Sequence, residues 1–109
     1  MMLFKPEHVD MILTGKKTQT RRLWKKRRAL VGSIHQARTE LFGKPFAYLK
    51  ILDVHQEYLG EISDEDCIKE GDYTYESYRD IWKKINKSYD TFQKVWVVEF
   101  VLTAYSEKK

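Results

Sequence analysis

A basic run near the N-terminus contains residue types that bind phosphate groups and transfer protons. Residues 15–28 carry eight Lys and Arg side chains and no acid, and the run begins with a glycine. The other 12 basic residues of the chain are outnumbered by its 16 acids, so the positive charge is concentrated in this one segment. Such a concentration is expected where phosphate groups must be attracted to one place.

The first half of this run predicts a turn followed by a strand. Gly15 allows a close backbone approach to a ligand, lysine supplies charge and arginine supplies a planar fork of donors. We expect an exposed or edge strand over 18–24, with side chains 17, 19 and 21 on one face and 18, 20 and 22 on the other. A solvated basic strand would show the same composition, so the pattern by itself leaves both interpretations open.

The second half of the run favours a polyanionic partner. Lys25–Arg28 add four cations that a small nucleoside does not need, whereas neutralised phosphates each contribute to the affinity for a nucleic acid. Trp24 has the ring to stack on an unpaired base, although a strand tryptophan is more often part of the core. The predicted nucleic-acid-binding residues are Lys16, Arg21, Trp24, Lys25, Lys26, Arg27 and Arg28.

The rest of the chain predicts the elements that position this run. Pro6 and Gly15 bound an amphipathic helix, Ser63 and Thr74 cap two more, and Tyr75 and Tyr78 are expected in the core. Strands are predicted at Met2–Phe4, Ile34–Ala37, Phe46–Leu59 and Lys94–Tyr105, the third with a bend or bulge. Without a repeated βαβ unit, this order predicts a single α+β domain over residues 1–109, a small antiparallel β-barrel decorated by about three helices.

The motif Gly15-x-Lys17-x-x-Thr20-x-Arg22 after an amphipathic helix, with the pair Glu70-Gly71 and a closing strand like Trp96–Phe100, resembles the ASCH domain, named for activating signal cointegrator homology. The resemblance covers nearly the whole chain. It implies a PUA-like β-barrel with a cleft, related to RNA-modification domains, that binds RNA or a nucleoside-derived ligand. The ligand-binding residues that it implies are Gly15, Lys17, Thr18, Thr20 and Arg22, with Glu70 also in the cleft.

One bacterial branch of this family consists of small amidohydrolases that remove the acetyl group from N4-acetylcytidine, and its Lys-Thr-Glu set matches Lys17, Thr20 and Glu70. In that reading Lys17 takes the proton of Thr20, the Thr20 oxygen attacks the amide carbonyl, and Glu70 moves protons or orients the base. As a base Lys17 needs a pKa about 3 pH units below its ordinary value of about 10.4. The cationic neighbours of Lys17 favour a lowered pKa, whereas Glu70 favours the charged ammonium form. Lys17 is therefore either a base or one partner of an ion pair.

These residues leave several functions open. We take binding of RNA or a nucleoside-derived ligand as the leading hypothesis, the amidohydrolase as the alternative, a ribonuclease as the third and a protein-interaction adaptor as the fourth.

Other features predict no metal and no cofactor. Cys67 is the only cysteine, and His8, His35 and His55 are far apart without flanking ligands. The nine acids from Glu57 to Asp80 are assigned mostly to helix capping and solvation. There is no signal-peptide pattern and no apolar run of about 20 residues, so we expect a cytoplasmic protein without a membrane partner.

Overall fold

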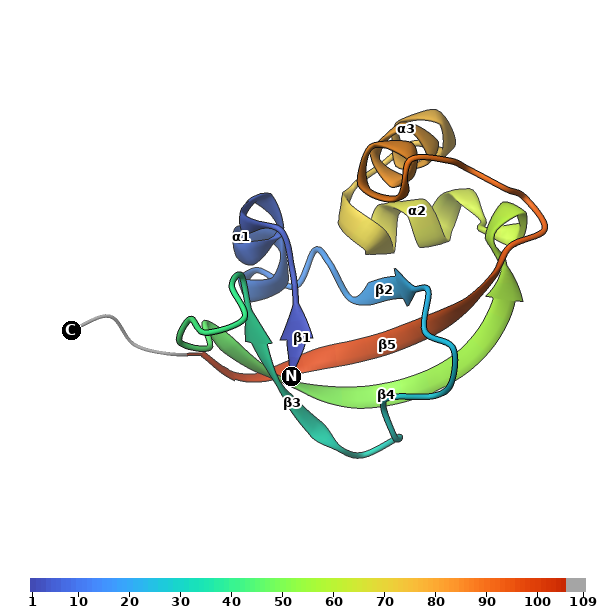
Figure 1. Ribbon diagram of the computed structural model, residues 1–109. Coiled ribbons are helices and arrows are strands. Elements are labelled where there is room, and N and C mark those ends of the chain that lie inside the picture. Colours follow the sequence, from blue (N-terminus) through green and yellow to red (C-terminus); the bar gives the residue numbers. More distant parts are fainter. Residues whose placement is uncertain (106–109) are drawn as a thin grey trace.

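The computed structural model describes residues 1–105 and contains a curled five-stranded sheet with helices packed along it (Figure 1). The elements in chain order are β1 (Met2–Leu3), a 3-10 turn (Pro6–His8), α1 (Val9–Leu13), β2 (Gln19–Arg22), β3 (Ile34–Arg38), β4 (Ala47–Tyr58), a second 3-10 turn (Leu59–Glu61), α2 (Asp64–Gly71), α3 (Tyr75–Asn86) and β5 (Lys94–Tyr105).

The sheet has the order β1-β3-β4-β5-β2 and forms a half-barrel, in agreement with the predicted α+β PUA-like fold. The long strands β4 and β5 pair antiparallel along their length, and two register shifts in their pairing let the pair curve. One of the shifts leaves Leu52 of β4 unpaired, in agreement with the bend or bulge predicted for this strand. In Figure 1, α1 lies over the sheet near β1, and α2 and α3 lie together near β2. The predicted antiparallel arrangement needs one correction, because β1 pairs parallel with β3.

Two apolar clusters hold these layers together, and β5 supplies residues to both. Val98 and Phe100 pack with the cluster that contains Ile12 of α1, whereas Val95 and Val97 pack with the cluster beneath α2 and α3. This division follows from the alternation of β5, whose successive side chains point to opposite faces of the sheet. Tyr78 is buried as expected, but Tyr75 is only half-buried.

The basic run is divided between two kinds of structure. Gly15 closes α1 with a positive φ of 78°, a conformation that glycine adopts without steric cost. The strand that follows is shorter than predicted, because β2 ends at Arg22 and residues 23–33 form a loop. Trp24 and the four cations Lys25–Arg28 therefore belong to the loop and not to a strand. Arg27 remains close to the sheet, because its guanidinium donates to the Val54 carbonyl at 3.4 Å and lies 5.8 Å from the centre of the Trp96 ring.

Helices α2 and α3 begin where the sequence predicts. Ser63 caps α2 by accepting a hydrogen bond from the Asp66 amide, and Thr74 caps α3 through the amide of Ser77. Asp72 ends α2 in the left-handed conformation, and the chain then turns into α3, so that the two helices lie together near β2 (Figure 1). None of the helices within residues 1–105 has the length and apolar character needed to cross a bilayer.

Candidate functional site

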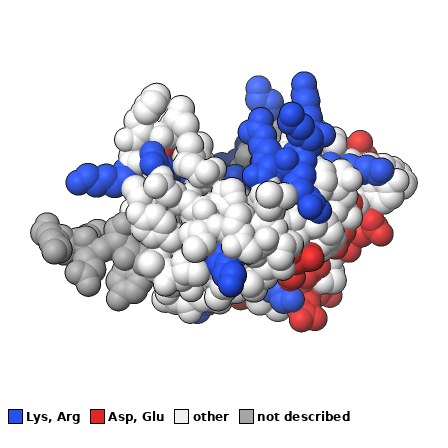
Figure 2. Space-filling view, turned by 90° about the horizontal axis from the view of Figure 1, so that it is seen from below, with Lys and Arg blue, Asp and Glu red and all other residues white. Residues whose placement is uncertain are grey.

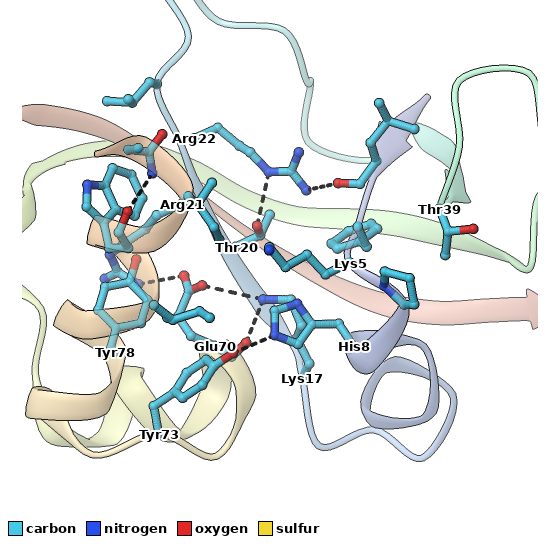
Figure 3. Close-up of a pocket in the computed structure, with 18 residues that line it drawn as sticks. Lys5, His8, Lys17, Thr20, Arg21, Arg22, Thr39, Glu70, Tyr73 and Tyr78 are labelled. Carbon is cyan, nitrogen blue, oxygen red and sulfur yellow. Dashed lines mark hydrogen bonds and ion pairs between the residues drawn. The ribbon is translucent and has the colours of Figure 1, made fainter. Parts of the chain in front are cut away.

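A cavity of about 410 Å3 lies between β2, the N-terminal 3-10 turn and the helices α2 and α3 (Figure 3). One wall is polar and includes Lys17, Thr20, Arg22 and Glu70. The opposite wall is largely apolar and comes from the side chains Tyr78, Ile81, Trp82 and Ile85 of α3. The cavity therefore combines a polar side and an aromatic side in a volume typical of small-molecule sites.

Backbone contacts bring β2 and α2 together at this cavity. The amides of Lys16 and Lys17 both bond to the Met11 carbonyl, which turns the chain after α1. The Thr18 amide then donates to the Lys69 carbonyl at 2.9 Å, and the Thr18 carbonyl accepts from Phe100 at 3.0 Å. Thr18 thus ties β2 to α2 and β5, and it is not among the residues that line the cavity.

Lys17 and Glu70, two residues that the family resemblance assigns to the cleft, both line the cavity and form an ion pair. Lys17 Nζ donates to the carbonyls of Gln19 at 2.9 Å and Glu70 at 2.6 Å, and lies 3.4 Å from Glu70 Oε1. Both residues are buried, with 3% and 5% of their surface exposed. Burial lowers the pKa of Lys17, Glu70 opposes this, and Arg22 adds to it. The opposing effects are those expected from the sequence, and burial outweighs the ion pair.

Arg21 lies behind this pair and does not face solvent. Its guanidinium donates to Glu70 Oε2 at 3.0 Å, to Glu57 Oε1 at 3.0 Å and to Asp66 Oδ2 at 3.3 Å, and it also contacts the Gln19 side chain. The Arg21 side chain is fully buried. Its predicted contact with a nucleic acid is therefore corrected: Arg21 is an internal partner of three carboxylates.

The contacts of Arg21 also correct the roles predicted for two acidic residues. Glu57 and Asp66 were assigned to solvation and capping, yet both pair with Arg21 across three elements of the fold. The sequence carried a signal for this, since side chains 17, 19 and 21 share one face of a strand and two of them are cations that need partners if that face is buried.

Thr20 and Arg22 occupy the other face of β2, as predicted from the alternation. Arg22 Nε donates to Thr20 Oγ1 at 3.1 Å and Nη2 donates to the Leu3 carbonyl at 2.8 Å, while the guanidinium lies 4.9 Å from the centre of the Phe4 ring. Arg22 thereby bridges the gap between the edge strands β1 and β2. No hydrogen bond joins Lys17 Nζ to Thr20 Oγ1 in this structure, although both residues line the same cavity.

Two further residues of the cavity were missed by the sequence analysis. His8 Nε2 and the Tyr73 hydroxyl are 2.7 Å apart, and both residues line the cavity (Figure 3). Burial, with added repulsion from Lys17 and Lys5, lowers the pKa of His8 to about 4, so this imidazole is neutral at pH 7. Tyr73 follows Glu70-Gly71 by only two positions, and that proximity was the available signal.

Gly71 has a steric role at the same place. A Cβ on Gly71 would lie 2.7 Å from Tyr73 Cε2 and 3.3 Å from His8 Nε2. The absence of a side chain lets Tyr73 reach His8 across the end of α2. In the Glu70-Gly71 pair, Glu70 is thus the ionic partner of Lys17, and Gly71 leaves room for the Tyr73 ring.

The remaining predicted residues lie outside this cavity. Gly15 and Lys16 are exposed at the turn after α1, and Lys25–Arg28 are exposed on the loop after β2. Figure 2 shows Lys and Arg side chains projecting together from one edge of the molecule, with Asp and Glu gathered at a neighbouring end. Trp24 is half-buried against the core cluster of α1 and borders a second cavity. Within residues 1–105 no group of three or more His, Cys, Asp or Glu is arranged to hold a metal ion.

Comparison with known proteins gives structural matches. No family model and no curated protein matches the sequence. An ASCH domain from Lactobacillus crispatus has a TM-score of 0.69 and 18% identity over 89% of this chain and 70% of its own. A protein from Enterococcus faecalis has a TM-score of 0.70 and 15% identity over 93% and 72% of the two chains. A variant of the Zymomonas mobilis ASCH protein has a TM-score of 0.63 and 15% identity over 92% and 66%. The protein therefore has the fold of ASCH domain proteins, the fold that its motif around Lys17 and Thr20 led us to expect.

Proposed function

We propose that the protein binds a ligand containing a nucleobase, a nucleoside derivative or part of an RNA, in the cavity between β2 and α3. The observation that carries this proposal is the pairing of a polar wall with an aromatic wall in one cavity of about 410 Å3. A base has a flat apolar face and a hydrogen-bonding edge, so it needs both kinds of wall. The ASCH fold supports the proposal, since the family resemblance implies a ligand of this class.

The polar wall offers donors and acceptors to the edge of a base. Each oxygen of the Glu70 carboxylate makes a contact with a cation and keeps lone pairs for an amino group of the ligand. The Thr20 hydroxyl accepts from Arg22 and keeps its own proton to donate. Opposite them, Tyr78 and Trp82 supply ring surface on which a base can pack.

A matched pair of variants tests this proposal. Thr20→Val removes a hydroxyl from the cavity wall. Thr18→Val makes the same change at a nearby residue that does not line the cavity. We expect Thr20→Val to weaken the binding of cytidine or N4-acetylcytidine about twofold to tenfold in calorimetry, the effect of one lost hydrogen bond, and Thr18→Val to leave it unchanged. Equal effects of the two variants, or no binding by the wild type, would contradict the proposal.

The exposed loop extends this proposal to longer ligands. Lys25–Arg28 are four neighbouring cations outside the cavity, and we infer that they contact phosphates of a bound RNA. Reversing these four charges is expected to weaken RNA binding and to flatten its dependence on salt concentration. An unchanged salt slope would limit the ligand to what the cavity itself holds.

A second candidate function is the hydrolysis of N4-acetylcytidine, favoured by the buried amine of Lys17, whose pKa is lowered and which lines the same cavity as Thr20. In this reaction neutral Lys17 accepts the proton of Thr20, and the Thr20 oxygen forms a bond to the acetyl carbon. The bond from that carbon to the exocyclic nitrogen breaks, the nitrogen takes the proton from Lys17, and water then releases acetate from Thr20. Lys17 must first leave its two carbonyl partners, and Thr20 must leave Arg22.

Mass spectrometry of N4-acetylcytidine incubated with the protein separates turnover from binding. We expect a hydrolase to produce cytidine and acetate, and to lose this activity in Lys17→Ala, Thr20→Ala and Glu70→Ala proteins that remain folded. Activity that survives all three changes would refute the assignment of these catalytic residues. Binding without turnover at high enzyme concentration would leave the cavity as a binding site.

A further inference from the structure

A second cavity, of about 550 Å3, lies next to the first and shares two of its lining residues, Leu3 and Arg22. Its other walls come from four segments: the N-terminus, the loop after β2, strand β3 and the loop after β3. Arg22 therefore stands at the boundary between two spaces, each large enough for a ring system with substituents.

The Arg22 guanidinium is held firmly at this boundary. Nε and Nη2 donate to Thr20 Oγ1 and the Leu3 carbonyl, and the plane lies over the Phe4 ring. Nη1 has no hydrogen-bond partner among residues 1–105, and the close-up shows it pointing away from these contacts (Figure 3). A fixed guanidinium with a remaining donor is suited to a phosphate oxygen placed between the two cavities.

The second cavity also has an aromatic surface and a cation. Trp24 packs on the core cluster beneath it, which holds the indole in place, and the residue is only half-buried, so part of it borders the cavity. Arg28 borders the same space from the exposed loop, and His35 borders it from β3. An aromatic ring beside cations is the combination that binds a base and its phosphate in single-stranded nucleic acid sites.

We propose that the ligand spans both cavities as two nucleotides joined by a phosphodiester: one base in the first cavity, the linking phosphate at Arg22, and the second base stacked on Trp24. This inference rests on the proposed function, because it takes the first cavity as a site for a base. It assigns to Trp24 and Arg28 a defined subsite, distinct from the general attraction of the loop cations. It also makes a segment of RNA, instead of a free nucleoside, the preferred ligand.

Affinities for three sets of probes test the inference: the four common nucleosides, their 5′-monophosphates and the dinucleotides ApA, CpC, GpG and UpU. We expect the best dinucleotide to bind at least tenfold more tightly than its nucleoside. Trp24→Leu is expected to weaken the dinucleotide about fivefold to 100-fold, the range for one stacked base, while leaving the nucleoside unchanged. Trp24→Phe keeps a ring and is expected to restore most of the affinity, which separates stacking from a folding defect.

Two variants of the loop form a matched pair. Arg28→Gln and Lys26→Gln each remove one exposed charge, but only Arg28 borders the second cavity. We expect a larger loss of dinucleotide affinity for Arg28→Gln than for Lys26→Gln at 150 mM salt, where the effect of distant charges is largely screened. Equal losses would mean that the loop acts only through its net charge and would overturn the role of Arg28.

The inference fails if dinucleotides bind no more tightly than nucleosides, or if Trp24→Leu weakens both to the same extent. It also fails if monophosphates bind as tightly as dinucleotides, because a phosphate site at Arg22 would then account for the gain. Failure of the proposed function looks different. In that case Thr20→Val changes the binding of none of the probes, whether or not Trp24→Leu does.

Discussion

Replacement of Glu70 by Gln removes a negative charge from between two buried cations. Glu70 Oε2 lies 3.0 Å from Arg21 Nη1 and Oε1 lies 3.4 Å from Lys17 Nζ, with 6% of the side chain exposed. Removal of one partner from a buried ion pair costs about 3–5 kcal/mol. Because Arg21 keeps two other carboxylates and Lys17 keeps two carbonyls, we expect Glu70→Gln to lower the free energy of unfolding by about 3 kcal/mol, the lower end of that range.

Glu57→Gln is the matched control, because Glu57 is another carboxylate partner of Arg21 and the substitution removes the same negative charge. The Glu57 side chain is 25% exposed, so water compensates for part of the loss. We expect this variant to lose about 1 kcal/mol or less. Urea unfolding followed by tryptophan fluorescence measures both changes, and with ordinary m-values a loss of 3 kcal/mol moves the midpoint by about 1–3 M.

The pH dependence of the Glu70→Gln effect has a definite sign. Glu70 raises the pKa of Lys17 against the larger effect of burial, so the variant lowers that pKa further. A lysine with a lowered pKa holds fewer protons in the folded state than in the unfolded state, and stability then rises with pH. The loss of unfolding free energy caused by the variant should therefore become smaller as the pH rises toward 10.5, the ordinary pKa of lysine. The reasoning is refuted if Glu70→Gln costs no more than Glu57→Gln, or if this loss becomes larger at high pH.

Three further outcomes are expected for His8 and His55. Gly71→Ala should displace the Tyr73 ring from His8, because the new Cβ would lie 2.7 Å from Tyr73 Cε2. Since burial is the main cause of the lowered pKa of His8, this pKa, measured by NMR, should then rise from about 4 toward its ordinary 6.5. In the wild type, stability should fall as the pH drops from 6.5 to about 4, since only the unfolded state then protonates His8, and His8→Gln should reduce this slope in urea titrations. The effect of His55 on stability should have the opposite sign. Burial lowers the pKa of His55, but hydrogen bonds to Glu57 and Asp53 outweigh burial and raise it. The stabilisation by His55 is therefore present below pH 6.5 and is lost above the raised pKa. Urea midpoints that are the same for His55→Gln and wild type at both pH 6 and pH 9 would contradict this contribution.

Much of the fold could be predicted from the sequence because its signals are local. The caps Ser63 and Thr74 and the glycine that ends the first helix, Gly15, each depend on residues a few positions apart, and each is found where it was expected. The parallel pairing of β1 with β3 was not predicted, because a two-residue strand carries no signal for its direction. The short length of β2 was missed for a related reason, since Trp24 resembles a strand residue in composition but lies on a loop.

For the candidate site, the sequence determined which residues share a face and the structure decided which face is buried. Alternation along β2 placed Lys17 with Arg21 and Thr20 with Arg22, whichever way the strand is turned. Only the packing of α2 on β2, through Thr18 and Lys69, turned Arg21 inward to three carboxylates. The aromatic wall from α3 and the contact of His8 with Tyr73 likewise depend on segments up to 65 positions apart. Local periodicity carries no information about contacts between such distant segments. The residue types of the motif could therefore be identified from the sequence, whereas their burial, their pKa shifts and the cavity depend on the tertiary structure.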